Sequence, residues 1–221
     1  MLPLLSCPLH YGEHQRIQRL HCAYIQSPPK LVDLWHDRIR KPHGDHLLVA
    51  ICWQGNPRAE RTHNRGRSIP LTHLLRLAEH ERIKFVSLQK GPGSEQLTPE
   101  LRSRFFVDCQ DEITATMPFE DSAAILSCCD LMITTDTGMA HLCGALGKPL
   151  WLLLSHRPDW RWGPHGECTF WYPDVSMFQQ PTQGDWSSVI DTVQIRLLSH
   201  LKTHTVRKGW PVEPMPPSCL E

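Results

Sequence analysis

The chain has 221 residues, 40% of them hydrophobic, and its 23 lysines and arginines balance 23 aspartates and glutamates. This length suits one hydrophobic core with appended segments, and the balanced charge provides no bulk field for binding a nucleic acid or an anionic membrane. Because no apolar run reaches the roughly 18 to 20 residues of a membrane span and the first residues lack a signal-peptide pattern, we expect a cytoplasmic protein with no membrane span.

The chain divides into three ranges by its sequence pattern. The first range is residues 1–45. Residues 1–30 are rich in proline and histidine, and residues 29–39 repeat apolar side chains at helical spacing, which predicts a short helix leading into the main domain. The main domain is expected over residues 46–202. The last range, 203–221, has a proline-rich end and is expected to be disordered.

Within the main domain, short apolar runs alternate with segments of helical periodicity. Residues 47–53 form a continuous apolar run, which is typical of a strand covered on both faces. The expected strands are 47–53, 83–88, 105–107, 131–135 and 149–154. The expected helices are 70–80, 99–104, 119–128, 138–145 and 186–201, and residues 155–184 are expected to be irregular.

This alternation of strands and helices with short links predicts an α/β fold, a Rossmann-like parallel sheet with helices on both faces. In such a sheet, ligands bind beyond the carboxyl ends of the strands, where the strand order reverses. Unusual polar residues follow three of the expected strands, at 54–56 and 65–68, at 89–95 and at 136–141. We expect these loops to converge on one edge of the sheet.

The segment from Asp136 to His141 is the most informative part of the sequence. It follows an apolar strand and opens a helix at Gly138, so free N–H groups and the positive end of the helix dipole would face the crevice. Thr137 can supply a hydroxyl, and His141 lies one turn into the helix on the same face. The segment predicts a phosphate site, but Asp136 and Gly138 are also the residues that an ordinary helix cap and tight turn use.

Three charged residues in the other two loops are further candidates at the same edge. Arg67 and Lys90 can neutralise a diphosphate, and Glu95 can accept hydrogen bonds from ribose hydroxyls. Charged loop residues more commonly serve only as solvated surface, so each candidate keeps that alternative.

Several other ligand classes lack their sequence patterns. The nine cysteines are odd in number and several fall in expected strands or helices, which suits reduced core residues better than disulfides. There is no Cys-x-x-Cys pair, and His141 and Cys143 would leave a helix on different sides, so we expect no metal. No Walker loop, Gly-x-Gly-x-x-Gly fingerprint or Gly-x-Ser-x-Gly elbow is present, and we expect no cofactor.

Five segments together carry a resemblance to a known family: residues 51–57, 67–71, 87–92, 130–141 and 158–162. They resemble the heptosyltransferase-like glycosyltransferases, glycosyltransferase family 9, and especially bacterial members that are joined to tetratricopeptide repeats. The resemblance extends over residues 2–200.

The resemblance implies the two-lobed GT-B architecture, in which the carboxy-terminal lobe holds a nucleoside diphosphate sugar, and this chain looks like that lobe. The positions that it assigns to the donor diphosphate are Asp136, Thr137, Gly138, His141 and Arg67. The positions that it assigns to the donor nucleotide are Gln89, Lys90 and, through a looser match, Glu95.

One half of the expected catalytic machinery has no counterpart in this sequence. Residues 2–9 look like a segment that follows the first lobe in longer relatives, so residues 1–45 are interpreted as a remnant of an inter-lobe segment with an approach helix. The family's general-base carboxylate belongs to the first lobe, so we predict no catalytic residue here. With an N-terminal lobe or a partner protein that supplies the base, the expected reaction is metal-independent transfer of a sugar to an acceptor hydroxyl.

Two other functions stay open at this point. The chain can be a non-catalytic sugar-nucleotide-binding module or enzyme remnant. It can also be a structural domain in which the tryptophan-rich segment from Trp151 to Trp186 is only packed core, because tryptophan buries a large apolar area.

Overall fold

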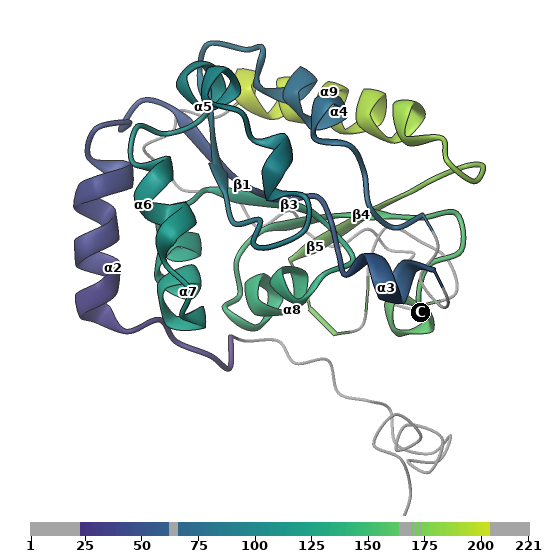
Figure 1. Ribbon diagram of the computed structural model, residues 1–221, viewed down its shortest axis with the longest axis horizontal. Helices are drawn as coiled ribbons and strands as arrows, with labels where there is room; N and C mark the ends of the chain where they lie inside the picture. The colour runs from purple at the N-terminus through teal and green to yellow at the C-terminus, as the bar shows by residue number, and fades with distance from the viewer. Residues whose placement is uncertain (1–22, 62–65, 164–168, 170, 173, 204–221) are drawn as a thin grey trace, which may run out of the picture.

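The centre of the molecule is a parallel sheet (Figure 1). The computed structural model describes residues 23–61, 66–163, 169, 171–172 and 174–203. In these residues five strands pair in the order β2-β1-β3-β4-β5. Their bounds are β1 Leu47–Cys52, β2 Ile83–Ser87, β3 Leu131–Thr135, β4 Leu150–Leu154 and β5 Val175–Gln179.

Helices cover both faces of this sheet. In Figure 1, α4, α5 and α9 lie above it and α2, α7 and α8 lie below it. The helices above are α4 Leu71–Leu75, extended by the 3-10 turn η3 Arg76–Ala78, α5 Pro99–Phe105 and α9 Trp186–Thr203. Those below are α2 Pro29–Trp35, extended by the π-helical turn η2 His36–Arg40, α7 Phe119–Cys128 and α8 Gly138–Ala145.

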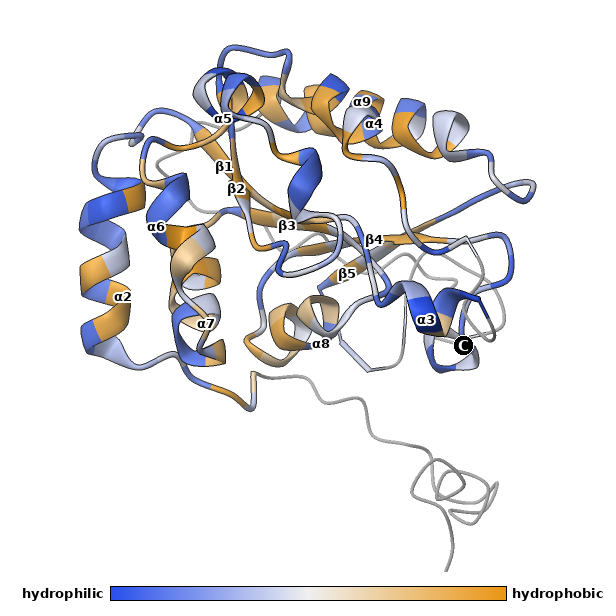
Figure 2. Cartoon of the chain, viewed as in Figure 1, coloured by the Kyte–Doolittle hydropathy of each residue, from blue (hydrophilic) through white to orange (hydrophobic). Residues whose placement is uncertain are grey.

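Two hydrophobic cores result from this layering, one on each face. Along β1, Leu48 and Ala50 point to the core with α7 and α8, whereas Val49 and Ile51 point to the core with α4 and α9. Every residue of β1, β3 and β4 is buried because both faces are covered, which explains the unbroken apolar runs of β1 and β4. Figure 2 shows the same division, with hydrophobic strands inside and hydrophilic outer faces on the helices.

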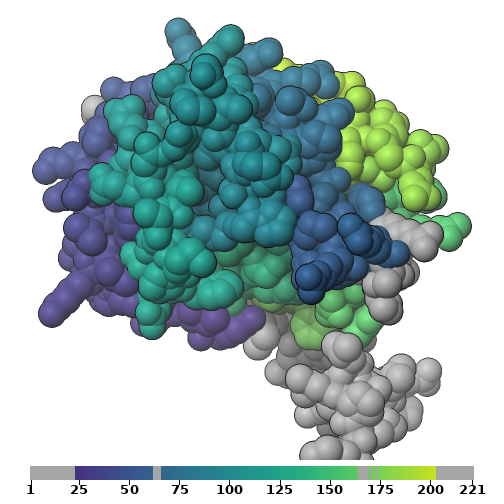
Figure 3. Space-filling model, viewed as in Figure 1, coloured from purple at the N-terminus to yellow at the C-terminus, as the bar shows by residue number. Residues whose placement is uncertain are grey.

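The helix α2 belongs to this layered structure. Trp35 is buried, and its Nε1 donates a hydrogen bond of 2.8 Å to Asp121 on α7. Figure 3 shows these early residues, in purple, against the teal surface that includes α7. The expected helix over 29–39 is therefore confirmed, but the predicted roles of residues 1–22 and 204–221 lie outside the described residues.

Two sequence predictions of secondary structure were wrong. Residues 105–107 do not form a strand, because Phe105 packs into the core as the last residue of α5 and Phe106 makes only an isolated parallel bridge to Phe85. The range 155–184 is not irregular throughout. It contains the edge strand β5 and the 3-10 turn η5 Trp160–Trp162.

Three short helical segments were also not predicted. They are α3 Pro57–Glu60, the 3-10 turn η4 Ser94–Gln96 and α6 Gln110–Ala115. The remaining expected strands and helices are present, and β3, α7 and α8 have the predicted bounds.

The cysteines that the structure describes are free thiols. They are Cys52, Cys109, Cys128, Cys129 and Cys143. Burial raises the pKa of Cys128 to about 11 and that of Cys143 to about 12, so these thiols stay protonated at neutral pH. Within the described ranges, no helix is long and apolar enough to cross a membrane, and no three His, Cys, Asp or Glu side chains are grouped to hold a metal ion.

Candidate functional site

The reversal in strand order lies between β1 and β3. The chain leaves β1 to form β2 on one side and then crosses to form β3 on the other side. An open parallel sheet with this order binds ligands at that point, beyond the carboxyl ends of the two strands. Here the two ends are tied together, because Thr134 Oγ1 donates a hydrogen bond of 2.8 Å to the Cys52 carbonyl.

The helix α8 begins directly above this reversal. Thr137 is its N-cap residue in an extended conformation, and the Thr137 hydroxyl lies 3.2 Å from that of Thr134. Gly138 is exposed, and a Cβ added there would meet no described atom within 4 Å. Open space thus lies beside the first turn of the helix, and the first N–H groups of a helix have no partner within it, which together favour an anion.

Arg67 reaches the same point from the loop after β1. Its Nη1 donates a hydrogen bond of 3.0 Å to the Asp136 carbonyl, and its side chain is only 15% exposed. The Nε atom lies 3.6 Å from Glu60 Oε1, and no hydrogen-bond partner reaches Nε in the described part of the chain. Gly55 makes room for the guanidinium, because a Cβ there would lie 2.4 Å from Nη2. The predicted neighbours Arg67 and Asp136 are therefore together.

His141 lies one turn into α8 in an aromatic environment. Its ring stacks on Trp162 with 4.8 Å between the centroids and 15° between the planes. Its Nδ1 lies 3.0 Å from the Tyr172 hydroxyl. Burial lowers the pKa of His141, so the imidazole is neutral at neutral pH.

Sequence reasoning did not identify Trp162 and Tyr172 as neighbours of His141. It gave packed core as one alternative for the tryptophan-rich segment, and Trp162 is indeed fully buried. The signal in the sequence was the resemblance of residues 158–162 to the family, which was a reason to consider a functional role for this turn.

The side-chain amide of Gln89 joins two loops through hydrogen bonds to their backbone groups. Its Oε1 accepts hydrogen bonds of 3.0 Å from the backbone N–H groups of Trp53 and Gln54. Its Nε2 donates to the carbonyls of Pro92, at 2.7 Å, and Gln54, at 3.0 Å. The buried amide thus fixes the loops after β1 and β2, which confirms that these loops meet at one edge.

Lys90 and Glu95 also bond within this part of the protein. The Lys90 ammonium donates to the carbonyls of Ile113 and Thr114, at the carboxyl end of α6, and burial lowers its pKa. Glu95 Oε2 accepts a hydrogen bond of 2.7 Å from the Gly93 N–H. The contacts predicted between a nucleotide and Gln89, Lys90 or Glu95 stay predictions, since the structure gives these side chains other partners.

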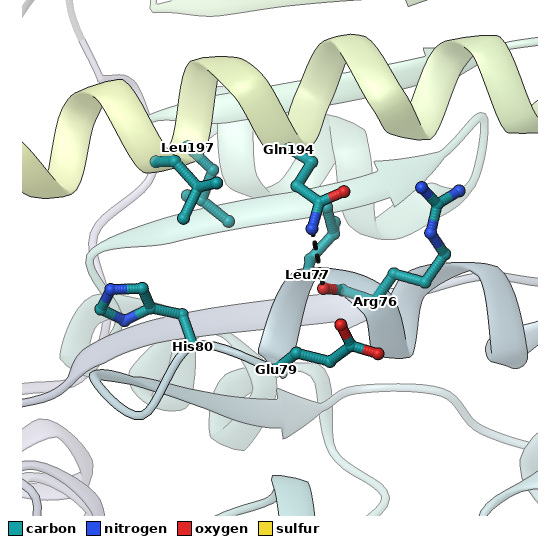
Figure 4. Close-up of a pocket in the computed structure, with 7 residues that line it drawn as sticks. Arg76, Leu77, Glu79, His80, Gln194 and Leu197 are labelled. Carbon is teal, nitrogen blue, oxygen red and sulfur yellow. Dashed lines mark hydrogen bonds between the residues drawn. The ribbon is translucent and has the colours of Figure 1, made fainter.

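A separate cavity of about 240 Å³ lies between η3 and α9 (Figure 4). Its lining is Arg76, Leu77, Glu79, His80, Gln194, Leu197 and Leu198. Gln194 Nε2 donates to the Arg76 carbonyl across it, at 3.4 Å. The cavity adjoins the segment that leads into β2, at the amino end of that strand, and holds none of the predicted ligand residues.

Comparison with known proteins identifies the family that the chain resembles. The family model described as glycosyltransferase family 9 (heptosyltransferase) matches residues 89–169. The chain resembles glycosyltransferase family 9. The matched range includes α8 and the loop after β2 but not Arg67, and the predicted link to tetratricopeptide repeats stays a prediction.

One relative and three solved structures illustrate the similarity. Protein FlbA of Caulobacter vibrioides is 27% identical over 177 residues, which cover 79% of this chain and 29% of FlbA. The ADP-heptose LPS heptosyltransferase II of E. coli has a TM-score of 0.55 at 14% identity, over 79% of this chain and 53% of that chain. A family 9 glycosyltransferase of Veillonella parvula has a TM-score of 0.52 at 14% identity, over 82% of this chain and 55% of that chain.

The third structure is E. coli heptosyltransferase WaaC with ADP-2-deoxy-2-fluoro heptose, with a TM-score of 0.50 at 15% identity, over 88% of this chain and 52% of that chain. These likenesses confirm the predicted α/β class, a Rossmann-like sheet of the kind that forms a lobe of the GT-B architecture. The chain spans about half the length of these solved structures and less than a third of FlbA.

Proposed function

We propose that this chain is the donor-binding half of a glycosyltransferase and that it holds the diphosphate of a nucleoside diphosphate sugar at the β1–β3 edge. The observation that carries the proposal is the meeting of the α8 N-terminus with the Arg67 guanidinium, joined by the hydrogen bond to the Asp136 carbonyl. A helix N-terminus and an arginine both complement phosphate oxygens. The solved relative WaaC, which carries an ADP-sugar analogue, supports this ligand class.

In the proposed reaction, this edge stabilises the leaving group. When the bond between the sugar and the diphosphate breaks, negative charge grows on the diphosphate oxygens. The N–H groups of Gly138 and Met139, with Arg67, oppose that charge from fixed positions, which lowers the barrier without a metal ion. Lys90 is left out of this role because its ammonium already bonds to the carboxyl end of α6.

The acceptor and the general base belong to a second lobe in this proposal. The second lobe is either an N-terminal lobe or a partner protein. This is in keeping with a chain that spans about half the length of its solved relatives. The base takes the proton from the acceptor hydroxyl as that oxygen bonds to the sugar, and the nucleoside diphosphate departs. We expect the chain alone to bind the donor but not to transfer the sugar. Sugar transfer that survives rigorous purification would contradict the assignment of the general base to the second lobe.

Calorimetric titration with ADP-, GDP- and UDP-sugars tests the proposal. We expect one of them to bind and Arg67→Ala to weaken that binding by about tenfold or more, because a hydrogen bond to a charged group contributes about 1.5–3 kcal/mol. The matched control is Arg76→Ala, which removes an exposed arginine beside the cavity of Figure 4. Failure of the folded protein to bind any of the three sugars would overturn the proposal.

A further inference from the structure

The aromatic residues around His141 determine how its imidazole is held. In an α-helix, side chains tilt toward the N-terminus, so His141 in the first turn of α8 leans toward the open helix start. Trp162 covers one face of the ring, and Tyr172 bonds to Nδ1. Within the described part of the chain, Nε2 makes no hydrogen bond, and the ring is half-buried.

Packing against α8 fixes the position of the Tyr172 ring. It is 8% exposed, and its ring lies directly on the backbone of α8 at Gly144. A Cβ at Gly144 would lie 2.4 Å from Cγ of the tyrosine ring. Gly144 is the penultimate residue of α8, and the absence of a side chain there lets the tyrosine ring approach the helix backbone.

The direction of the Tyr172–His141 hydrogen bond follows from acidity. A phenol hydroxyl is a better donor than a neutral imidazole N–H, and an imidazole nitrogen is a better acceptor than a phenol oxygen. Burial and the neighbouring Tyr24 hydroxyl raise the pKa of Tyr172, so its hydroxyl keeps its proton at neutral pH. Because the Tyr24 phenol oxygen is a weaker acceptor than the imidazole nitrogen, the proton is donated to Nδ1, and the single proton of the neutral imidazole resides on Nε2.

We propose that Tyr172 is a positioning residue that fixes His141 as an Nε2–H donor toward a phosphate oxygen of the ligand. This inference rests on the proposed donor site, and it adds a residue that neither the sequence motifs nor the arginine contact identifies. The imidazole then binds as a neutral donor in a set orientation, and no protonation step precedes binding.

Long-range proton–nitrogen NMR of the imidazole in the ligand-free protein tests the tautomer without any ligand. We expect protonated Nε2 and unprotonated Nδ1 in His141, and a proton on Nδ1 would overturn the inference. Addition of a nucleoside diphosphate sugar that the calorimetry has shown to bind should move the Nε2 resonance. An unchanged Nε2 resonance at saturation would also overturn it, whether or not any variant folds.

A double-mutant cycle separates a positioning role from simple packing. Tyr172→Phe keeps the ring on Gly144 and removes only the hydroxyl, so we expect about three- to tenfold weaker donor binding, the loss of one hydrogen bond. In a His141→Ala background the same change should have no further effect on affinity. Equal losses in both backgrounds would contradict the role of Tyr172. Failure of the wild-type protein to bind any nucleotide sugar would instead count against the donor site, while the tautomer measurement still tests the Tyr172–His141 bond.

Discussion

The two ends of the sheet each contain a largely buried arginine, and the two arginines are bonded very differently. At the amino end, Arg40 is 17% exposed and its Nη2 lies 2.7 Å from Asp130 Oδ2. It also donates to the carbonyls of His46 and Cys128, and Asp130 accepts from the Leu48 N–H. At the carboxyl end, Arg67 is 15% exposed, and among the described residues it has one carbonyl partner and a carboxylate at 3.6 Å.

This difference is what we expect if Arg40 has a structural role and Arg67 has the proposed ligand role. The Arg40 guanidinium has a close carboxylate and two carbonyls, so its charge is compensated within the fold. The Arg67 guanidinium has a buried Nε without a hydrogen-bond partner among the described residues, next to an open helix start. Similar burial therefore does not imply a similar role, and the predictions below separate the two.

The largest effect is expected at the amino end. Asp130→Ala removes the partner of Arg40 and leaves a buried charge uncompensated, which costs about 3–5 kcal/mol of the free energy of unfolding. Urea unfolding followed by tryptophan fluorescence measures this change. The control is Asp191→Ala, whose partner Arg76 is 41% exposed, and it should cost less than about 1 kcal/mol. Equal losses of unfolding free energy in the two variants would contradict the structural role of the Arg40–Asp130 pair.

A binding effect without a large stability effect is expected for Gly55→Ala. The new Cβ would collide with the Arg67 guanidinium, at 2.4–2.5 Å, and that group can move because it ends a flexible side chain. We expect donor affinity to fall by about tenfold, in line with a disturbed hydrogen bond to a charged group. Calorimetry measures the donor affinity and urea unfolding measures the free energy of unfolding, both on the same sample. A loss of stability with unchanged affinity would mean that Arg67 only supports the fold.

A smaller binding effect is expected at the start of α8. Gly138→Ala adds a methyl group that meets no described atom within 4 Å, so it should not lower the free energy of unfolding. It should still weaken donor binding by severalfold, because the methyl group keeps a phosphate away from the helix N–H groups. If affinity is unchanged, the ligand does not approach this backbone.

The smallest effect is expected from the pH dependence of stability at the amino end. Burial lowers the pKa of His43 below its usual 6.5, in spite of Asp108 nearby and with His46, Lys84 and Arg40 adding to the decrease. The unfolded chain therefore binds a proton first as pH falls, so the contribution of His43 to stability is full above pH 6.5 and is lost as pH falls toward the folded pKa. His43→Asn should flatten that loss in urea unfolding between roughly pH 7.5 and 5.5, and an unchanged slope would contradict this reading.

The central part of the fold could be predicted because its signals are strong and local. The run from Leu131 to Ile133 is apolar, and two β-branched threonines and a polar turn with a glycine follow it, so β3 and α8 have the predicted bounds. The edge strand β5 was missed because Ser176 and Gln179 interrupt its apolar pattern, as an edge position allows. The helix α6 was missed because Ile113 is its only buried hydrophobic residue and gives no periodic stripe.

The candidate site could be predicted only in part, because contacts depend on how loops close. The convergence of three loops follows from the parallel topology, and the sequence located it correctly. The partners of individual side chains do not follow from topology. Gln89 and Lys90 have the polarity of ligand residues, yet the loops fold so that their atoms satisfy backbone groups. Tyr172 is 31 residues from His141 in the sequence, and no local pattern joins them.

The central claim is that a diphosphate binds where α8 begins. The most direct measurement is a titration of the isotope-labelled chain with a series of nucleoside diphosphates, following the backbone amide resonances by NMR. The account predicts the largest shifts at Gly138 and Met139, with smaller shifts near Arg67. Shifts confined to the cavity between η3 and α9, or no shift in a folded protein at millimolar ligand, would contradict it.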